Sequence, residues 1–188
     1  MKAGEIMNYY SEIKNELINN EITKKVKDYS KNKSDLTTYY NVGKLLSEAG
    51  KHYGEGIIKN FSLKLINEVG KKYNTTTLKR MRQFYWLIEK GAPLGHQLTW
   101  SHYRELLPIK DINEIKYYIH ISEEQNLTRD ELKSRIKSDE YNRLPIEFKD
   151  KIISKEELII KDFIKNPIII KNNTNKEIIS EKVLQKVI

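Results

Sequence analysis

A cluster of cationic side chains stands directly ahead of an aromatic group in the stretch 73–86, which reads YNTTTLKRMRQFYW. Lys79, Arg80 and Arg82 fall within four residues, and positions 69–88 contain no Asp or Glu. Arginine and lysine bind backbone phosphates and guanine edges, glutamine binds adenine, and hydroxyl groups bind backbone oxygens. The residue types gathered here are therefore those of a helix that meets duplex DNA.

Helical periodicity divides this stretch into two faces. At about 100° per residue the apolar side chains fall within one arc of roughly 120°. This predicted buried stripe consists of Leu78, Met81, Phe84, Tyr85 and Ile88. The opposite arc and the two lysines before the helix supply the predicted DNA contacts, which are Lys71, Lys72, Thr75, Thr76, Lys79, Arg80, Arg82 and Gln83. Asn74 or Thr75 is expected to cap the helix. The alternative is an amphipathic helix whose cations simply face water.

The segments between the few glycines and prolines repeat apolar residues at helical spacing, which predicts an all-α fold. One helix is expected around residues 6–17, a second at 37–50 and a third from about Ile57 to Tyr73. The cationic stretch supplies a fourth at 75–88. The succession of helix, short polar turn and helix predicts a helical bundle that contains a helix-turn-helix near 57–88, with a winged-helix-like form as one alternative.

Three more helices are expected after Gly95, in LTWSHYRELLPI, DINEIKYYIHISEEQ and TRDELKSRIKSDEYNRL. Thr128 and Glu131 form a T-x-x-E pattern, which predicts a capping box at the start of the last one. His102, within WSHYRE, is expected to pack or cap near a helix start. Past Pro145 neither helical nor alternating spacing is clear, which predicts an irregular C-terminal extension. We therefore expect a helical domain over 1–145 and a linker from 146 onward.

The composition indicates which kind of partner and which cellular compartment suit the chain. The formal net charge of +8 favours an anionic partner, although abundant Lys, Ile and Asn together also fit biased codon usage. No cysteine is present, which excludes disulfides and thiolate metal sites. The N-terminus carries glutamates where a signal peptide needs an apolar run, and no stretch approaches the roughly 20 apolar residues of a membrane span. A cytoplasmic protein is expected.

Four runs of sequence carry a resemblance to a known family: YNVGKLL, TLKRMRQFY, LTWSHYRELLPIKD and NLTRDELKSRIKSDEYNRL. In this order and spacing they resemble the N-terminal domain of the YhcG-like family, long classed as a domain of unknown function and associated with PD-(D/E)XK nucleases. The resemblance covers roughly residues 10–145. A weaker similarity of pattern, to the helix-turn-helix of ParB-like partition proteins, places the reading helix at the same position.

The resemblance implies a helical module, binding DNA or partners, joined to a C-terminal restriction-like nuclease domain. ISEKVLQKVI, at 179–188, resembles the first helix of that nuclease domain, so 146–188 is expected to hold the linker and the start of a nuclease domain that is otherwise missing. In the reading helix the family has Asn where this chain has Thr77, and Ser where it has Asn74. Ser and Asn both cap helices well.

No catalytic residue is predicted in this chain. A PD-(D/E)XK site needs a Pro-Asp and an acid-x-Lys on adjacent strands, and the chain has no Pro-Asp. Three acid-x-Lys triplets, beginning at Glu12, Glu114 and Glu147, are expected by chance in a sequence so rich in Glu and Lys. The histidines lack metal-site spacing, and no phosphate-binding or dinucleotide loop occurs, so neither a metal nor a cofactor is predicted.

Two hypotheses from different classes remain. The first is a DNA-binding module for double-stranded DNA, non-catalytic by itself. The second is a protein–protein interaction or dimerisation module that assembles a nuclease with itself or with a defence or restriction partner. Tyrosines of the first two helices would supply that interface: Tyr9, Tyr10, Tyr39 and Tyr40.

Overall fold

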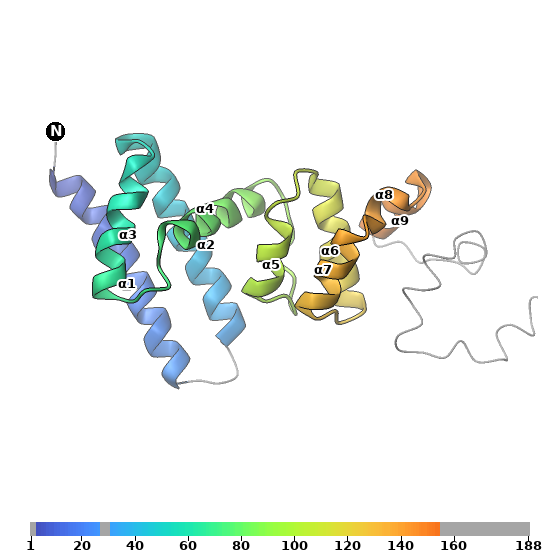
Figure 1. Cartoon of the computed structure of the whole chain (residues 1–188), viewed down its shortest axis with the longest axis horizontal. Helices are drawn as coiled ribbons and strands as arrows, with labels where there is room; N and C mark the ends of the chain where they lie inside the picture. The colour runs from blue at the N-terminus through green and yellow to red at the C-terminus, as the bar shows by residue number, and fades with distance from the viewer. Residues whose placement is uncertain (1–2, 27–30, 155–188) are drawn as a thin grey trace, which may run out of the picture. The chain divides into compact units, whose positions relative to one another are not determined.

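The structure is a computed structural model that describes residues 3–26 and 31–154. These residues form nine helices and no strand (Figure 1). The all-α prediction is therefore confirmed for the described part of the chain. The chain divides into two compact units, Met1–Lys110 and Asp111–Ile188, and each is considered separately.

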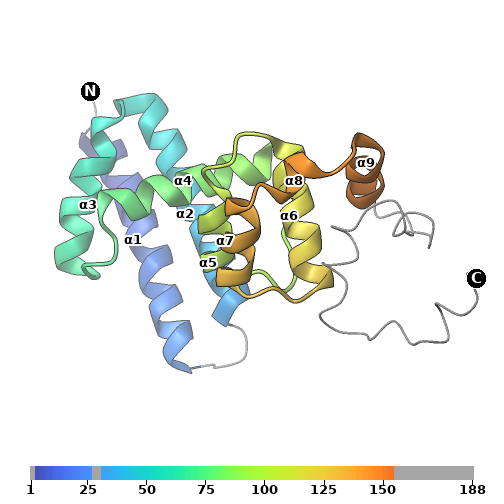
Figure 2. The same cartoon turned by 45° about the vertical axis from the view of Figure 1, so that its right-hand side comes forward.

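The first unit is built around a pair of long helices. α1 and α2 run side by side in opposite directions, as Figures 1 and 2 both show. Their facing apolar residues are fully buried and include Ile13, Leu17, Val42 and Leu46. The helices of this unit are α1 (Ala3–Val26), α2 (Lys31–Tyr53), α3 (Gly56–Glu68), α4 (Thr75–Glu89) and α5 (Trp100–Leu106).

Helix α4 crosses α2 and packs more extensively against it than against α3. Gly43 of α2 allows this, since a Cβ there would lie 2.3 Å from the Met81 carbonyl oxygen. One turn along α2, the Ser47 hydroxyl accepts a hydrogen bond of 2.9 Å from the Trp86 indole. Gly50 follows on the same face, with the Arg82 guanidinium 3.2 Å from where its Cβ would be. The small residues along α2 therefore allow the backbone of α4 to pack close to that of α2.

An aromatic cluster joins α4 to α5. The rings of Phe84 and Tyr103 lie with their centroids 4.9 Å apart, and Trp100 lies 5.6 Å from Phe84 and 4.8 Å from Tyr39. Edge-on and tilted pairs of this kind add to the gain from burial alone. The face of α4 that carries Phe84 is thereby fixed toward the interior.

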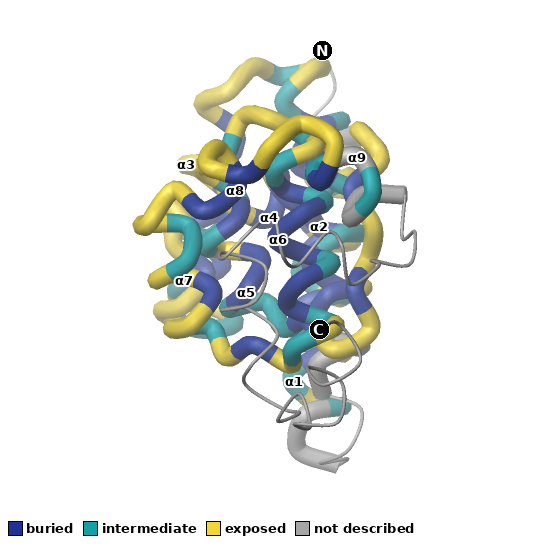
Figure 3. The backbone as a smooth tube through the Cα atoms, turned by 90° about the vertical axis from the view of Figure 1, so that its right-hand side faces the viewer, coloured by how far each residue is buried: buried dark blue, intermediate teal, exposed yellow. Residues whose placement is uncertain are grey.

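The described part of the second unit, residues 111–154, consists of four helices. In Figure 3 the tube of α6 alternates between dark blue and teal over most of its length, because Ile115, Tyr118 and Ile119 among others are buried. The predicted capping box is confirmed: the Thr128 hydroxyl accepts from the Glu131 backbone N–H, and the Glu131 carboxylate accepts from the Thr128 N–H. The helices are α6 (Ile112–Glu124), α7 (Arg129–Lys137), α8 (Glu140–Arg143) and α9 (Ile146–Ser154).

Several boundaries differ from the sequence prediction. The third helix ends at Glu68 rather than near Tyr73, because Gly70 adopts a positive φ of 156° that breaks the helix. The expected irregular extension begins with a helix instead, since α9 spans 146–154 and buries Phe148. The rest of the extension, including 179–188, lies outside the described residues. Within 3–26 and 31–154 no helix is both long enough and apolar enough to cross a membrane.

The helix-turn-helix remains a prediction. α3 and α4 are joined by the residues 69–74, a connection longer than the three or four residues common in DNA-binding pairs. A winged-helix variant would add a β-hairpin, and the described residues hold no strand. The start of α4 at Thr75, in contrast, lies where the sequence predicted it.

Candidate nucleic-acid interface

The first turn of α4 is capped as predicted. The Asn74 side chain accepts a 3.0 Å hydrogen bond from the Thr77 backbone N–H. The N–H groups of Thr75 and Thr76 have no acceptor within the helix, because the first turn of any helix lacks one. Such N–H groups, aided by the positive end of the helix dipole, favour an anion. The N-terminus of α4 can therefore add to a phosphate contact that side chains of the same helix make.

Asn74 provides a test of how firmly the start of α4 is held. We expect Asn74→Ala to lower the free energy of unfolding by about 1 kcal/mol, because the cap hydrogen bond is lost. Asn74→Ser is the matched control and should stay within a few tenths of wild type. Trp86 lies on this helix, so urea unfolding followed by tryptophan fluorescence is the measurement. Equal midpoints for the alanine and serine variants would contradict the capping role.

The outward face of α4 is cationic and polar over about two turns. Its exposed side chains recur every three or four residues, the spacing of one helix face. They are Thr76, Lys79, Arg80 and Gln83. Thr75, also predicted as a contact, is half-buried. Of the eight predicted contacts, four therefore share this face, and we call these four residues the α4 stripe.

Arg82 does not lie on the outward face, so the sequence prediction of its orientation is wrong. Its side chain is only 10% exposed and its two Nη atoms each donate a 2.7 Å hydrogen bond to the Glu55 carboxylate. The guanidinium also stacks on the Trp86 ring, 4.7 Å from the centroid. A helical wheel places a charged residue in water, but a partner 27 positions away in sequence holds this one against α2.

Glu55 is the residue that sequence reasoning missed. It lies in the Gly54-Glu55 link between α2 and α3. The hydrogen bonds from Arg82, with the charges of Arg82 and Lys79, lower the pKa of Glu55. Gly50 leaves room for the pair, since a Cβ there would come within 3.6 Å of the Glu55 Oε1. The detectable signal was a glycine inside a helix, where glycine costs about 1 kcal/mol relative to alanine.

The two lysines that precede α4 differ in whether an ion pair within the protein holds them. Lys71 is exposed. Lys72 is exposed too, but its ammonium lies 2.6 Å from a Glu21 carboxylate oxygen, which also accepts a hydrogen bond of 2.9 Å from the Tyr73 hydroxyl. Burial, and the bond to Glu21, raise the pKa of Tyr73. Glu21 of α1 thus ties the connection between α3 and α4 in place, and Lys72 would reach a phosphate only by exchanging this ion pair.

The buried stripe of α4 is confirmed in part. Leu78, Met81 and Phe84 are buried, whereas Tyr85 and Ile88 are half-buried. Tyr85 contacts Tyr40 of α2 with ring centroids 5.3 Å apart. Trp86 is 41% exposed, and its ring is held by the Arg82 guanidinium and by Ser47. The tryptophan therefore borders the α4 stripe while serving the packing of α4 on α2.

His102 and the three acid-x-Lys triplets singled out in the sequence lie on helices. His102 is buried, and its Nδ1 accepts a 3.1 Å hydrogen bond from the Thr99 N–H, which confirms the capping prediction. The acid-x-Lys triplets that begin at Glu12, Glu114 and Glu147 lie on helices α1, α6 and α9, not on strands. Across the described ranges, no group of three or more acidic or histidine side chains has the arrangement of a metal site.

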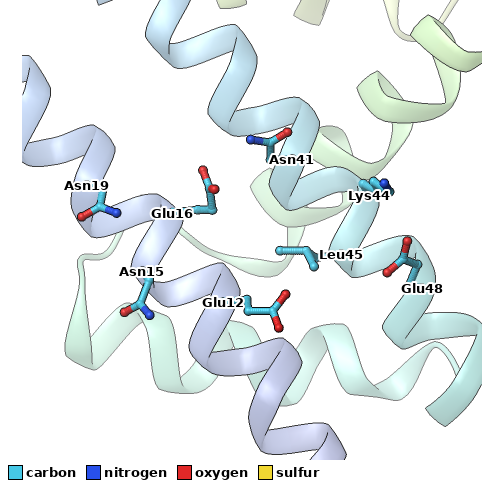
Figure 4. Close-up of a pocket in the computed structure, with 8 residues that line it drawn as sticks. All are labelled: Glu12, Asn15, Glu16, Asn19, Asn41, Lys44, Leu45 and Glu48. Carbon is cyan, nitrogen blue, oxygen red and sulfur yellow. The ribbon is translucent and has the colours of Figure 1, made fainter.

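A second polar surface lies between α1 and α2. It is an open groove of about 510 Å³, into which Glu12, Glu16 and Leu45 extend from the two helices (Figure 4). Three glutamates and one lysine line it, so its charge opposes that of the α4 stripe. Its lining residues are Glu12, Asn15, Glu16, Asn19, Asn41, Lys44, Leu45 and Glu48.

The tyrosines proposed for a protein interface divide between core and surface. Tyr10 and Tyr39 are 6% and 7% exposed, so that they belong to the interior. Tyr9 and Tyr40 are half-buried. Burial raises the pKa of Tyr10, as does the nearby charge of Glu68. An interface on these helices would thus rest on the groove rather than on all four tyrosines.

Comparison with known proteins identifies the family of this chain. The sequence profile of the DUF1016 N-terminal domain matches residues 7–143. This match spans α1 to α8 and agrees with the YhcG-like resemblance seen in the sequence. No curated protein and no solved structure matches the chain. The chain belongs to the DUF1016 N-terminal domain family.

Proposed function

We propose that the chain is a DNA-binding module that docks the α4 stripe against duplex DNA and is non-catalytic by itself. The observation that carries this proposal is the exposure of Thr76, Lys79, Arg80 and Gln83 on one helix face with no acidic residue from 69 to 88. Such a face combines phosphate-binding cations with a base-reading amide. The net charge of +8 adds long-range attraction to DNA.

Each residue of the site has a definite role in this proposal. Lys79 and Arg80 contact phosphates, and Gln83 reads a base edge. Lys71 lies just before the helix start and reaches the neighbouring phosphate, beside the open N–H groups of Thr75 and Thr76. Phosphate contacts set affinity on all sequences about equally, so removal of Lys79 or Arg80 weakens binding everywhere, whereas Gln83 affects sequence preference.

The family resemblance supports a role for the module beside a nuclease. In that arrangement the helical part finds DNA and a C-terminal PD-(D/E)XK domain, or a partner subunit, cleaves it. A bacterial defence or restriction process in the cytoplasm would use such a division of labour. The absence of cysteine is compatible with a reducing compartment.

Fluorescence anisotropy of a labelled duplex of about 30 base pairs, titrated at several salt concentrations, tests the proposal. We expect the affinity of the wild-type chain to fall steeply with salt. Lys79→Ala/Arg80→Ala should reduce the slope of log affinity against log salt by about 2, because each lost phosphate contact removes about 0.9. At low salt its affinity should be at least about tenfold lower.

The matched control is Lys44→Ala/Lys51→Ala, which removes the same charge from exposed lysines of α2. It should bind nearly as tightly as wild type. If the two double variants lose affinity equally, binding reflects net charge and not the α4 stripe. If the wild-type chain does not bind at about 50 mM salt, the cations are a solvated surface and the proposal fails.

The acidic groove between α1 and α2 favours a second candidate, an interaction or dimerisation module. A groove lined by three glutamates and one lysine suits a basic surface on a partner or a second copy. Light scattering distinguishes the candidates. A tight dimer without DNA affinity, weakened by salt and by Glu12→Gln/Glu16→Gln, would favour this function over DNA binding.

A further inference from the structure

The contact between Arg82 and Glu55 has the geometry of an occupied oxyanion site. Both Nη atoms of Arg82 donate to the two carboxylate oxygens of Glu55, each at 2.7 Å. This parallel pair of bonds is also how arginine binds a phosphate group. The carboxylate and a phosphodiester are thus interchangeable at this edge of the guanidinium.

The Arg82 guanidinium is enclosed on the side that faces the protein interior and is open to solvent on the side of Glu55. The Arg82 side chain is 10% exposed and its Nε is buried without a hydrogen-bond partner. Trp86 covers one face of the guanidinium, and Gly50 of α2 leaves the space that the group fills. Glu55, in contrast, is 68% exposed, so that the Nη edge faces solvent through the carboxylate.

Glu55 can release Arg82 by a rotation of its side chain alone, because that side chain is largely exposed. Glu55 stands between Gly54 and Gly56, and neither glycine would bring a Cβ within 4 Å of any other atom. Gly54 has a φ of 79°, which glycine adopts without strain. An incoming anion that replaces the Glu55 carboxylate keeps the buried Arg82 charge paired, so the exchange leaves no buried charge without a partner.

The site adjoins the α4 stripe. Lys79 stands one helical turn before Arg82, close enough for its charge to act on the Glu55 carboxylate. A backbone phosphate bound by Lys79 would therefore approach the same edge of Arg82 that Glu55 holds.

We propose that Arg82 is a phosphate site that Glu55 occupies in the free protein and that a DNA phosphate takes over when the α4 stripe docks. This inference rests on the proposed function. In this scheme Glu55 competes with the DNA phosphate for Arg82 and thereby lowers the affinity of the free protein for DNA. In the bound state Arg82 keeps its stacking on Trp86 and exchanges only its anion.

The same anisotropy titration tests the inference with Glu55→Gln. We expect its affinity for the duplex to rise about three- to tenfold, because the competitor for Arg82 is gone. The slope of log affinity against log salt should stay nearly unchanged, because Arg82 contacts a phosphate in both complexes. Glu89→Gln, at the exposed last residue of α4, loses the same charge, and Glu89 pairs with Tyr40 rather than with Arg82. It should change affinity less than about twofold.

Two further variants separate release of Arg82 from a simple change of local charge. Glu55→Asp keeps the charge but shortens the side chain by one methylene, so it should bind DNA more tightly than wild type if Glu55 acts by holding Arg82. In an Arg82→Met background, which keeps the length of the apolar stem, Glu55→Gln should give no gain. Circular dichroism checks that each variant is folded. If Arg82→Met does not fold, Glu55→Asp alone tests whether Glu55 acts by holding Arg82.

The outcomes are distinct from those for the proposed function. If the wild-type chain binds through Lys79 and Arg80 while Glu55→Gln gains no more than Glu89→Gln, the inference is wrong and the proposed function stands. The inference is also wrong if Glu55→Asp binds like wild type. If no variant binds DNA at low salt, both fail together.

Discussion

Replacing Gly43 by alanine should lower the free energy of unfolding of the first unit by about 1–3 kcal/mol or more. The new Cβ would lie 2.3 Å from the Met81 carbonyl oxygen and 2.8 Å from the Tyr85 Cβ. Both atoms belong to the rigid middle of α4, so no flexible side chain can yield. Alanine itself favours a helix by about 1 kcal/mol, and the steric cost must exceed that gain before any loss is seen.

Gly56→Ala is the matched control, because a Cβ there would meet nothing within 4 Å and the residue opens α3. It should leave stability unchanged or raise it by about 0.4–1 kcal/mol. Both tryptophans, Trp86 and Trp100, lie in the first unit, so urea unfolding followed by their fluorescence reports on it. If Gly43→Ala unfolds at the same urea concentration as Gly56→Ala, α4 does not approach α2 as closely as described.

The helix caps of both units could be predicted from the sequence, because capping depends on residues close together in the chain. The start of α4 follows from the Asn74 cap and the helical period beyond it, and both are confirmed. The capping roles of Thr128 and His102 were likewise set by residues three positions apart. Interactions of this range depend on the chain alone, so a sequence suffices to predict them.

The placement of Arg82 could not be predicted in this way. A helical wheel assigns a charged residue to solvent, and only tertiary packing brings Glu55 from 27 positions away. The two glycines inside α2, at 43 and 50, were the usable signal, because glycine weakens a helix unless another element must approach closely. The predicted DNA contacts of Lys79, Arg80 and Gln83 are exposed but their function remains a prediction.

The second unit contains a buried carboxylate that should be its most sensitive position. Glu140 is 4% exposed, and its Oε1 accepts a short hydrogen bond from the Tyr117 hydroxyl. The Arg135 Nη1 lies 3.6 Å from the same oxygen, an ion-pair distance beyond hydrogen-bond range. Arg135 is further held through Nη2, which donates a 2.6 Å bond to Gln125. Burial, then the charge of Glu140, raises the pKa of Tyr117, so the phenol stays protonated and donates.

We expect Glu140→Ala to lower the free energy of unfolding of the second unit by about 3–5 kcal/mol, because it leaves the Arg135 charge, on a side chain only 14% exposed, and the buried Tyr117 hydroxyl without their acceptor. Glu140→Gln keeps an oxygen for Tyr117 and should cost about 1–3 kcal/mol. The exposed Glu147→Gln, which removes the same charge from α9, should stay within about 0.5 kcal/mol of wild type.

Hydrogen–deuterium exchange of the α6 and α8 amides, with urea unfolding followed by circular dichroism, measures these effects. The order of stability should be wild type, then Glu140→Gln, then Glu140→Ala. A Glu140→Leu variant adds a sharper test, since an apolar side chain that fills the space still leaves Arg135 unpaired. If leucine restores wild-type protection, the cost of losing Glu140 is a cavity and not an unpaired charge. The burial of Arg135 is then compensated by Gln125 alone.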